Sequence, residues 1–264
     1  MDSSAFNAIF AVHRQTYFHM TALTQDFIDR CPEENGFRMR GLEMTRLEVF
    51  IDAAFAFSVT MLVISFDSMP QSYDELMVAI KSIPAFVIAL AQLFWIWHTH
   101  NVWSRRFGLD TTYTVFISAV LLAVVLIYVY PMRIMAAGLF AWLTDDYLPA
   151  TIKEINYDQL RVRFIFLGLG FVALCGVYVR MYRYAERLKD QLLLNDYELR
   201  ETQNLAIKWN GAAVVGLMCV ALAIVLPSEV VPYSGFSFLL LIFWFPFVTY
   251  WRSKSLAGNL DDDL

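Results

Sequence analysis

Three ionisable side chains open an otherwise apolar segment, RLEVFIDAAFAFSVTMLVIS, and are the first candidates for chemistry in this sequence. Arg46 and Glu48 stand at its start, where long charged side chains can reach water from the end of a membrane helix. Asp52 stands about two turns further in. A carboxylate at that depth must face protein or water, so it either joins helices or takes part in moving protons or cations. The joining role is favoured.

Helical spacing separates these charges. At about 100° per residue, Arg46 and Phe50 share one face of a helix, and Asp52 points away from both. Arg46 and Asp52 are therefore expected to find their partners on another helix or another subunit.

A second stripe of the same segment is apolar except for one hydroxyl. By spacing alone it is either a packing seam between helices, which is favoured, or the wall of a narrow pore. The residues of this stripe are Ala53, Phe57, Thr60 and Ile64, with Met61 at its edge and with Phe55, Val59 and Leu62 on the opposite side.

Two histidines follow in QLFWIWHTHNVWSRRF and resemble a metal-binding pair at first sight. Residues two apart on a helix diverge, however, and no nearby acid completes a ligand set around His98 and His100. No metal is therefore expected. Trp97 and His100 are three apart and share a face. A hydrogen bond from His100 to Asp52, or to a backbone carbonyl of a neighbouring helix, is the favoured interpretation.

The elements that must position these residues are membrane helices. Apolar residues make up 58% of the 264 residues and charged residues 17%, against about 45–50% and about 25% in soluble domains. A net charge of −5 argues against a nucleic-acid partner. Roughly 20 apolar residues cross a bilayer as a helix. Six segments qualify, at 47–65, 77–97, 113–130, 164–182, 206–226 and 235–251.

The distribution of lysine and arginine predicts the orientation. Fifteen of the twenty basic residues fall on the side that holds both termini, and basic residues mark the cytoplasmic side. We therefore expect an all-α membrane protein with six transmembrane helices and cytoplasmic N and C termini. Its parts are a cytoplasmic N-terminal arm (1–45), a six-helix transmembrane domain (46–252) and a cytoplasmic tail (253–264).

Two further segments have their own patterns. An apolar patch at Ala5, Phe6, Ile9 and Phe10 is typical of a helix lying on the membrane surface, or of one packed on its own bundle. Residues 132–150 follow Pro131 on the outer side and are expected to form a short amphipathic or re-entrant piece.

Several function classes are disfavoured. The sequence contains no Walker loop, no GxSxG and no HExxH motif. No TVGYG-type carbonyl filter is present, and no pair of broken helices repeats between the halves as in inverted-repeat transporters. An enzyme is not expected, and no cofactor is implied.

The motifs of the first two spans carry a family resemblance. Arg46-x-x-x-Phe50-x-Asp52 resembles the RxxxFSD signature of the transmembrane protein 175 family of potassium-permeable channels, and Trp97-x-x-His100 resembles its W-x-x-H segment. One six-helix unit per chain resembles the bacterial branch. The resemblance implies a homotetramer in the lipid bilayer, the bacterial inner membrane, with the first helices lining a central pore.

The resemblance also implies roles for single residues. Phe57, Met61 and Ile64 match the family's apolar constriction, with Thr60 as the nearby hydroxyl. The signature residues Arg46, Phe50 and Asp52 would tie the first helix to Trp97 and His100. The sequence departs from the pattern at two places: Ile51 replaces the serine of the signature, and Phe57 is bulkier than the usual isoleucine or leucine.

The expected function is that of a weakly selective cation channel that passes potassium or other monovalent cations past an apolar constriction. Two alternatives remain open. One is a proton or solute transporter that uses Asp52 and His100 within each subunit. The other is a non-conducting oligomeric membrane scaffold.

Overall fold

The structure is a computed structural model that describes residues 23–64, 70–150 and 156–261. Long helices form almost all of the described structure, and two antiparallel strands of two residues each form a hairpin near its start. The elements are α2 (Gln25–Arg30), β1 (Glu33–Glu34), β2 (Phe37–Arg38), α3 (Arg46–Ile64), α4 (Tyr73–Lys81), α5 (Ile83–Phe107), α6 (Thr112–Leu143), α7 (Tyr157–Arg187), α8 (Asp196–Val225), η1 (Ser228–Leu239) and α9 (Leu240–Asp261).

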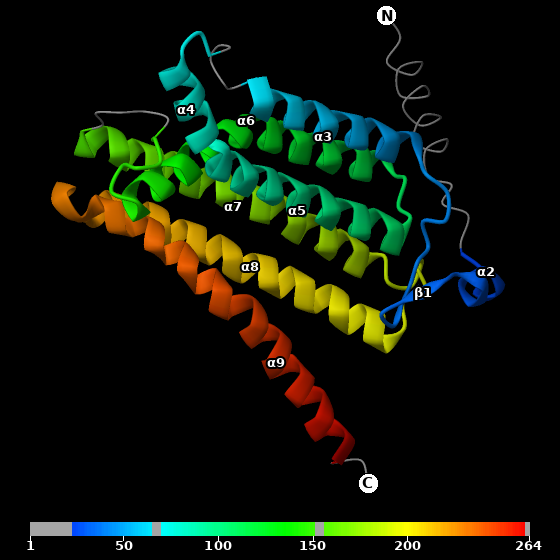
Figure 1. The fold of residues 1–264 in the computed structure, drawn as a ribbon. Helices are drawn as coiled ribbons and strands as arrows, with labels where there is room; N and C mark the ends of the chain where they lie inside the picture. The colour runs from blue at the N-terminus through cyan, green and yellow to red at the C-terminus, as the bar shows by residue number, and fades with distance from the viewer. Residues whose placement is uncertain (1–22, 65–69, 151–155, 262–264) are drawn as a thin grey trace, which may run out of the picture.

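The long helices form a bundle in which α3, α5, α6, α7 and α8 run side by side (Figure 1). Helix α3 packs on α5 and α6, and α7 packs on α6 and α8. Helix α9 contacts α8 and then diverges from the bundle towards the C-terminus (Figure 1). The patch at residues 5–10 lies outside the described residues.

Five helical segments are long and apolar enough to cross a membrane within the described part of the chain. They are Tyr73–Phe107, Thr112–Leu143, Tyr157–Arg187, Asp196–Val225 and Ser228–Trp251, and they contain five of the six expected spans. The remaining expected span corresponds to α3, which is 19 residues long.

The expected separate piece after Pro131 is wrong. Helix α6 continues through Pro131 to Leu143. Proline removes one backbone donor, but helices inside a membrane tolerate it because neighbouring groups satisfy the freed carbonyl. A break occurs instead between α4 and α5, where Lys81 ends one helix and Pro84 occupies the first turn of the next, a position that suits proline.

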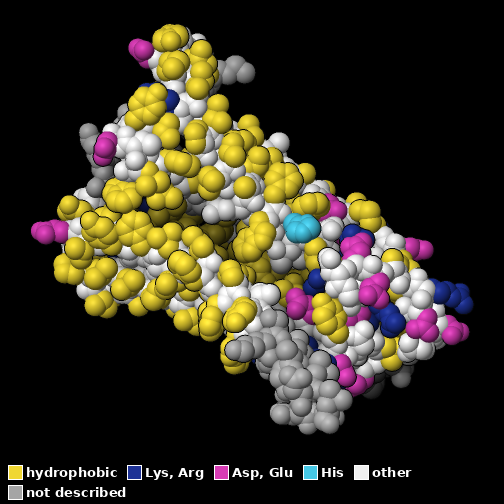
Figure 2. All heavy atoms as spheres, turned by 60° about the horizontal axis from the view of Figure 1, so that its bottom comes forward, with side chains coloured by type: hydrophobic (Ala, Val, Ile, Leu, Met, Phe, Trp, Pro, Cys, Tyr) yellow, Lys and Arg dark blue, Asp and Glu magenta, His cyan; other side chains and the backbone are white. Residues whose placement is uncertain are grey.

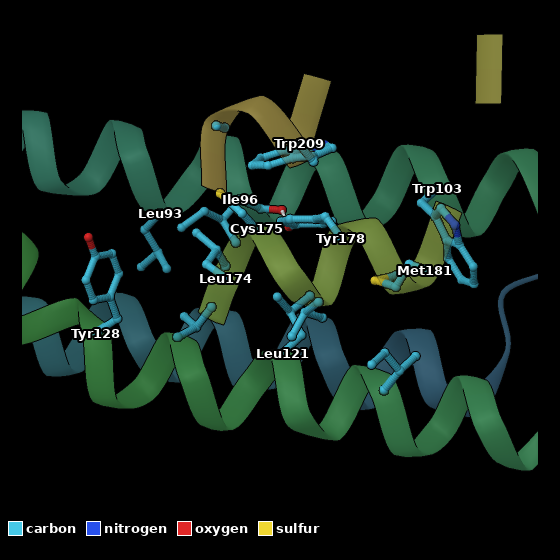
Figure 3. Packing of buried hydrophobic residues seen from close by; sticks show 14 of the residues in the cluster. Leu93, Ile96, Trp103, Leu121, Tyr128, Leu174, Cys175, Tyr178, Met181 and Trp209 are labelled. Carbon is cyan, nitrogen blue, oxygen red and sulfur yellow. Dashed lines mark hydrogen bonds between the residues drawn. The ribbon is translucent and has the colours of Figure 1, made fainter. Parts of the chain in front are cut away.

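Aromatic packing joins the bundle at its centre. The rings of Tyr178 and Trp209 stack with centroids 4.4 Å apart, and the Tyr178 hydroxyl donates to the Ile96 carbonyl at 2.6 Å (Figure 3). These contacts link α7 to α8 and to α5. Trp103 and Leu121 fill the adjoining layers and are fully buried. The buried Tyr178 hydroxyl thus has a hydrogen-bond partner, as buried polar groups usually do.

The surface is divided along the length of the bundle. Hydrophobic side chains cover most of the face in Figure 2, and charged side chains gather at the end that carries α2 and the turn between α7 and α8. A broad apolar face with charges at the end is typical of helices surrounded by lipid.

Candidate functional site: the first helix and its anchors

Helix α3 has one buried and one exposed face in the single chain. Its buried residues recur every three or four positions against α5 and α6, as a helix packed on one side requires. They are Ile51, Phe55, Ser58 and Leu62. The exposed residues follow the same period on the other side and include Val49, Phe50, Ala53, Ala56, Phe57, Thr60 and Val63.

Of the residues expected at a constriction, Phe57 is 56% exposed and Thr60 is also exposed, while Met61 is half-buried. The side chain of Ile64 lies outside the described residues. The Thr60 hydroxyl donates its proton to the Phe57 carbonyl at 2.6 Å. Since a hydroxyl has one donor and two lone pairs, Thr60 presents an acceptor oxygen on the exposed face.

Asp52 lies beside α5. The Trp97 indole donates a hydrogen bond from Nε1 to Asp52 Oδ1 at 2.7 Å. The carboxylate therefore has a donor on a neighbouring helix and not on its own, as the helical spacing required. Arg46 and Phe50 lie on the exposed side of α3, where Phe50 is 63% exposed.

Glu48 makes the second contact between α3 and α5. Its Oε2 accepts from the Thr45 backbone N–H at 2.7 Å, and Thr45 Oγ1 accepts from the Glu48 N–H, which is a capping box. The other oxygen, Oε1, accepts from the Ser104 hydroxyl at 2.5 Å. The T-x-x-E spacing before an apolar run is the signal in the sequence from which this capping box could be found.

His100 has a partner that the sequence did not suggest. Its Nε2 lies 3.2 Å from Ser118 Oγ on α6, so the expected bond to Asp52 or to a carbonyl is not the contact formed. His100 is buried and His98 exposed, as their spacing predicted. Within residues 23–64, 70–150 and 156–261, no group of three or more His, Cys, Asp or Glu is placed to hold a metal ion.

The described part of the N-terminal arm is fixed by a buried ion pair. Arg40 Nη2 lies 2.6 Å from Glu198 Oε2, and both side chains are almost completely buried. Arg40 also donates to the carbonyls of Leu192 and Leu193 in the turn before α8. This pair binds the arm, 158 residues away in sequence, to the first turn of α8.

The arm also crosses the end of α5. The Gly41 N–H donates to the Arg105 carbonyl at 2.9 Å. Gly108 ends α5 in the left-handed region, with φ of 57°, and a Cβ there would lie 2.9 Å from the Arg40 carbonyl carbon. Glycine is required on both counts. Only a few residues separate this crossing from Arg46, so the arm sets where α3 begins.

The chain resembles a curated protein in sequence and a solved structure in fold. A potassium channel of Marivirga tractuosa is 32% identical over 178 residues, which span 65% of this chain and 71% of that protein. A crystal structure of a variant of the potassium channel MtTMEM175, bound to a nanobody-MBP fusion protein, superposes with a TM-score of 0.73. The match covers 84% of this chain and 99% of that one, at 26% identity.

The chain belongs to the transmembrane protein 175 family. It is accordingly an integral membrane protein, and the curated relative and the solved structure are each named as a potassium channel. No model of a known protein family matches the chain.

Proposed function

We propose that this chain is the subunit of a homotetrameric, potassium-permeable channel in which four copies of α3 line the pore. The observation that carries the proposal is the exposed apolar stripe of α3. It contains Phe57 and Thr60, and it lies on the helix that carries the family signature. Four copies around an axis would cover that stripe, and the sequence match and the structure match are each named as a potassium channel. Potassium and other monovalent cations are the proposed ligands.

The proposed topology adds α3 to the five longer helices as a sixth span, with both termini in the cytoplasm of a bacterial cell. The Lys and Arg asymmetry supports this orientation. The cytoplasmic arm (1–45), the transmembrane domain (46–252) and the cytoplasmic tail (253–264) follow from it. Helix α9 continues to Asp261, so part of the tail extends the last helix.

The proposed constriction is formed by Phe57, Met61 and Ile64, with Thr60 between them. An apolar ring closes a pore by excluding water and makes an ion shed part of its hydration shell to pass. Conductance should therefore be low and selectivity for potassium modest. The free lone pairs of Thr60 and the faces of four Phe57 rings are the groups available to replace lost water.

Neither alternative has a specific observation in its favour. A proton relay through Asp52 and His100 would need them to be connected, but Asp52 is bonded to Trp97 and His100 contacts Ser118. The scaffold interpretation shares the tetramer with the channel and differs only in carrying no ion flux.

Cysteine accessibility tests the proposal, because two phenylalanines of α3 face opposite ways. Phe57 is 56% exposed and Phe55 is 4% exposed. In membranes, a water-soluble cationic thiol reagent should modify Phe57→Cys and block potassium flux, and should leave Phe55→Cys unmodified. Phe243→Cys on α9, exposed towards the proposed lipid face, is the control that should also stay unmodified. An unreactive Phe57→Cys would refute the pore.

A further inference from the structure

A buried arginine stands behind the outer end of α3. Arg133 belongs to α6 and is 6% exposed within the membrane-spanning segment Thr112–Leu143. A charge at such a position is costly unless its environment compensates it, and charges in membrane segments commonly serve function. The contact of Arg133 therefore bears on what α3 does.

The guanidinium meets the backbone of α3. Arg133 Nη1 donates to the Leu62 carbonyl at 3.3 Å. Leu62 lies in the last turn of helix α3, which spans Arg46–Ile64. A cation there also interacts favourably with the negative end of the helix dipole.

The fold contains the same device at a second helix. Arg161 of α7 donates to the carbonyls of Ala223, Ile224 and Leu226 at 2.8–3.0 Å and so caps the C-terminal end of α8. Helix α8 is packed against α7, η1 and α9, whereas α3 has the exposed apolar stripe. The two arginines thus make the same kind of contact on helices with different roles.

We propose that Arg133 is a positioning residue for the pore, because it fixes the outer end of α3 and thereby the level and rotation of the constriction. This inference rests on the proposed function. Leu62, whose carbonyl Arg133 binds, has its side chain buried against the bundle, and Met61 is its half-buried neighbour. Loss of the bond would loosen the last turn of α3 and widen the passage at Met61.

The test compares Arg133→Gln with Arg161→Gln in proteoliposomes. Arg133→Gln should bring potassium-over-sodium selectivity towards unity and raise the modification rate of Met61→Cys several-fold. Arg161→Gln should leave both unchanged while lowering the thermal stability of the tetramer. Selectivity and accessibility are chosen because a merely structural cap would not move them.

A second pair of variants keeps the test decisive if Arg133→Gln does not assemble. Lysine keeps the charge but lacks the planar fork of arginine, so Arg133→Lys should shift the Met61→Cys modification rate and Arg161→Lys should not. The inference is overturned if an Arg133 variant and the matching Arg161 variant lower the thermal stability of the tetramer equally, and neither changes the potassium-over-sodium selectivity or the Met61→Cys modification rate. Phe57→Cys with Arg133 intact separates the two proposals. If the reagent does not modify Phe57→Cys, both the pore and the role of Arg133 are wrong. If it does modify Phe57→Cys but the Arg133 variants change neither selectivity nor accessibility, only the role of Arg133 is wrong.

Discussion

Replacement of Arg40 by methionine should release the N-terminal arm from the turn between α7 and α8. The substitution removes both hydrogen bonds to the Glu198 carboxylate and those to the carbonyls of Arg38, Leu192 and Leu193. Glu198 would keep the backbone N–H groups of Arg38 and Asn195 but would be a buried charge without its counter-ion. Breaking such a pair costs about 3–5 kcal/mol.

Alkylation of Cys31 reports the opening of the arm. Cys31 lies at the end of α2, buried, and its thiol donates to the Phe27 carbonyl. When the reaction is limited by local opening, its rate follows the opening equilibrium, so Arg40→Met should accelerate it roughly 10²–10⁴-fold. Arg40 also favours the Cys31 thiolate. Loss of the Arg40 charge disfavours the thiolate and so slows alkylation. The measured increase in the alkylation rate is therefore a lower bound on the increase in opening. Peptide mapping separates Cys31 from Cys175 and Cys219.

Arg105→Met is the matched control. Arg105 also pairs with a glutamate of the arm, Glu34, at 2.8 Å, but both side chains are about half exposed. Such pairs contribute about 0–1 kcal/mol, so the rate should rise by about fivefold at most. Replacing the buried pair by Arg40→Met with Glu198→Leu should recover much of the loss. Equal acceleration by Arg40→Met and Arg105→Met would mean that the buried Arg40–Glu198 pair does not hold the arm in place.

Three further predictions concern the arm, the α3–α5 contact and α9. Burial raises the pKa of the Cys31 thiol. The docked arm is therefore fully stable below the pKa of the exposed thiol, and it loses stability as the pH rises through the higher pKa of the docked thiol. Proteolysis of the arm should quicken at alkaline pH, and Cys31→Ala should remove that pH dependence. Trp97→Phe removes the donor to the α3 carboxylate and should destabilise the fold by about 1–3 kcal/mol in thermal unfolding. Trp103→Phe is the matched control. The indole N–H of Trp103 has no partner among the described residues, so this substitution loses packing but no hydrogen bond. Gly211→Ala places a Cβ against the Trp244 ring and should displace α9, which a lowered melting temperature would register; an unchanged melting temperature would contradict the close packing.

The helices could be predicted from the sequence because their signal is local. Continuous apolar runs located the spans, and the outcome at Pro131 shows the limit of that signal. Proline weakens a helix locally, but the packing of α6 in the bundle decides whether it continues. The expected span 77–97 contains the second half of the short helix α4, and Lys81 and Pro84 mark the break only once both helix ends are known.

The sequence predicts that some side chains need partners on other helices, but it does not identify those partners. Spacing showed that Asp52 must look outside its own helix, but it could not identify Ser118 as the partner of His100, because the facing of α6 depends on the whole bundle. The Arg40–Glu198 pair joins residues 158 positions apart, which no local pattern reveals. Only its local half was readable: Asn195 and Glu198 form a capping box at the start of α8.

Ion flux from proteoliposomes, measured with the mass of the assembly in the same sample, decides whether four copies of α3 line a pore. We expect tetramers that carry potassium in preference to sodium. Phe57→Ala should increase the flux several-fold, and Phe243→Ala, at an exposed position of α9, should leave it unchanged. Tetramers that stay silent even as Phe57→Ala, or monomers that carry the flux, would contradict a pore lined by four copies of α3.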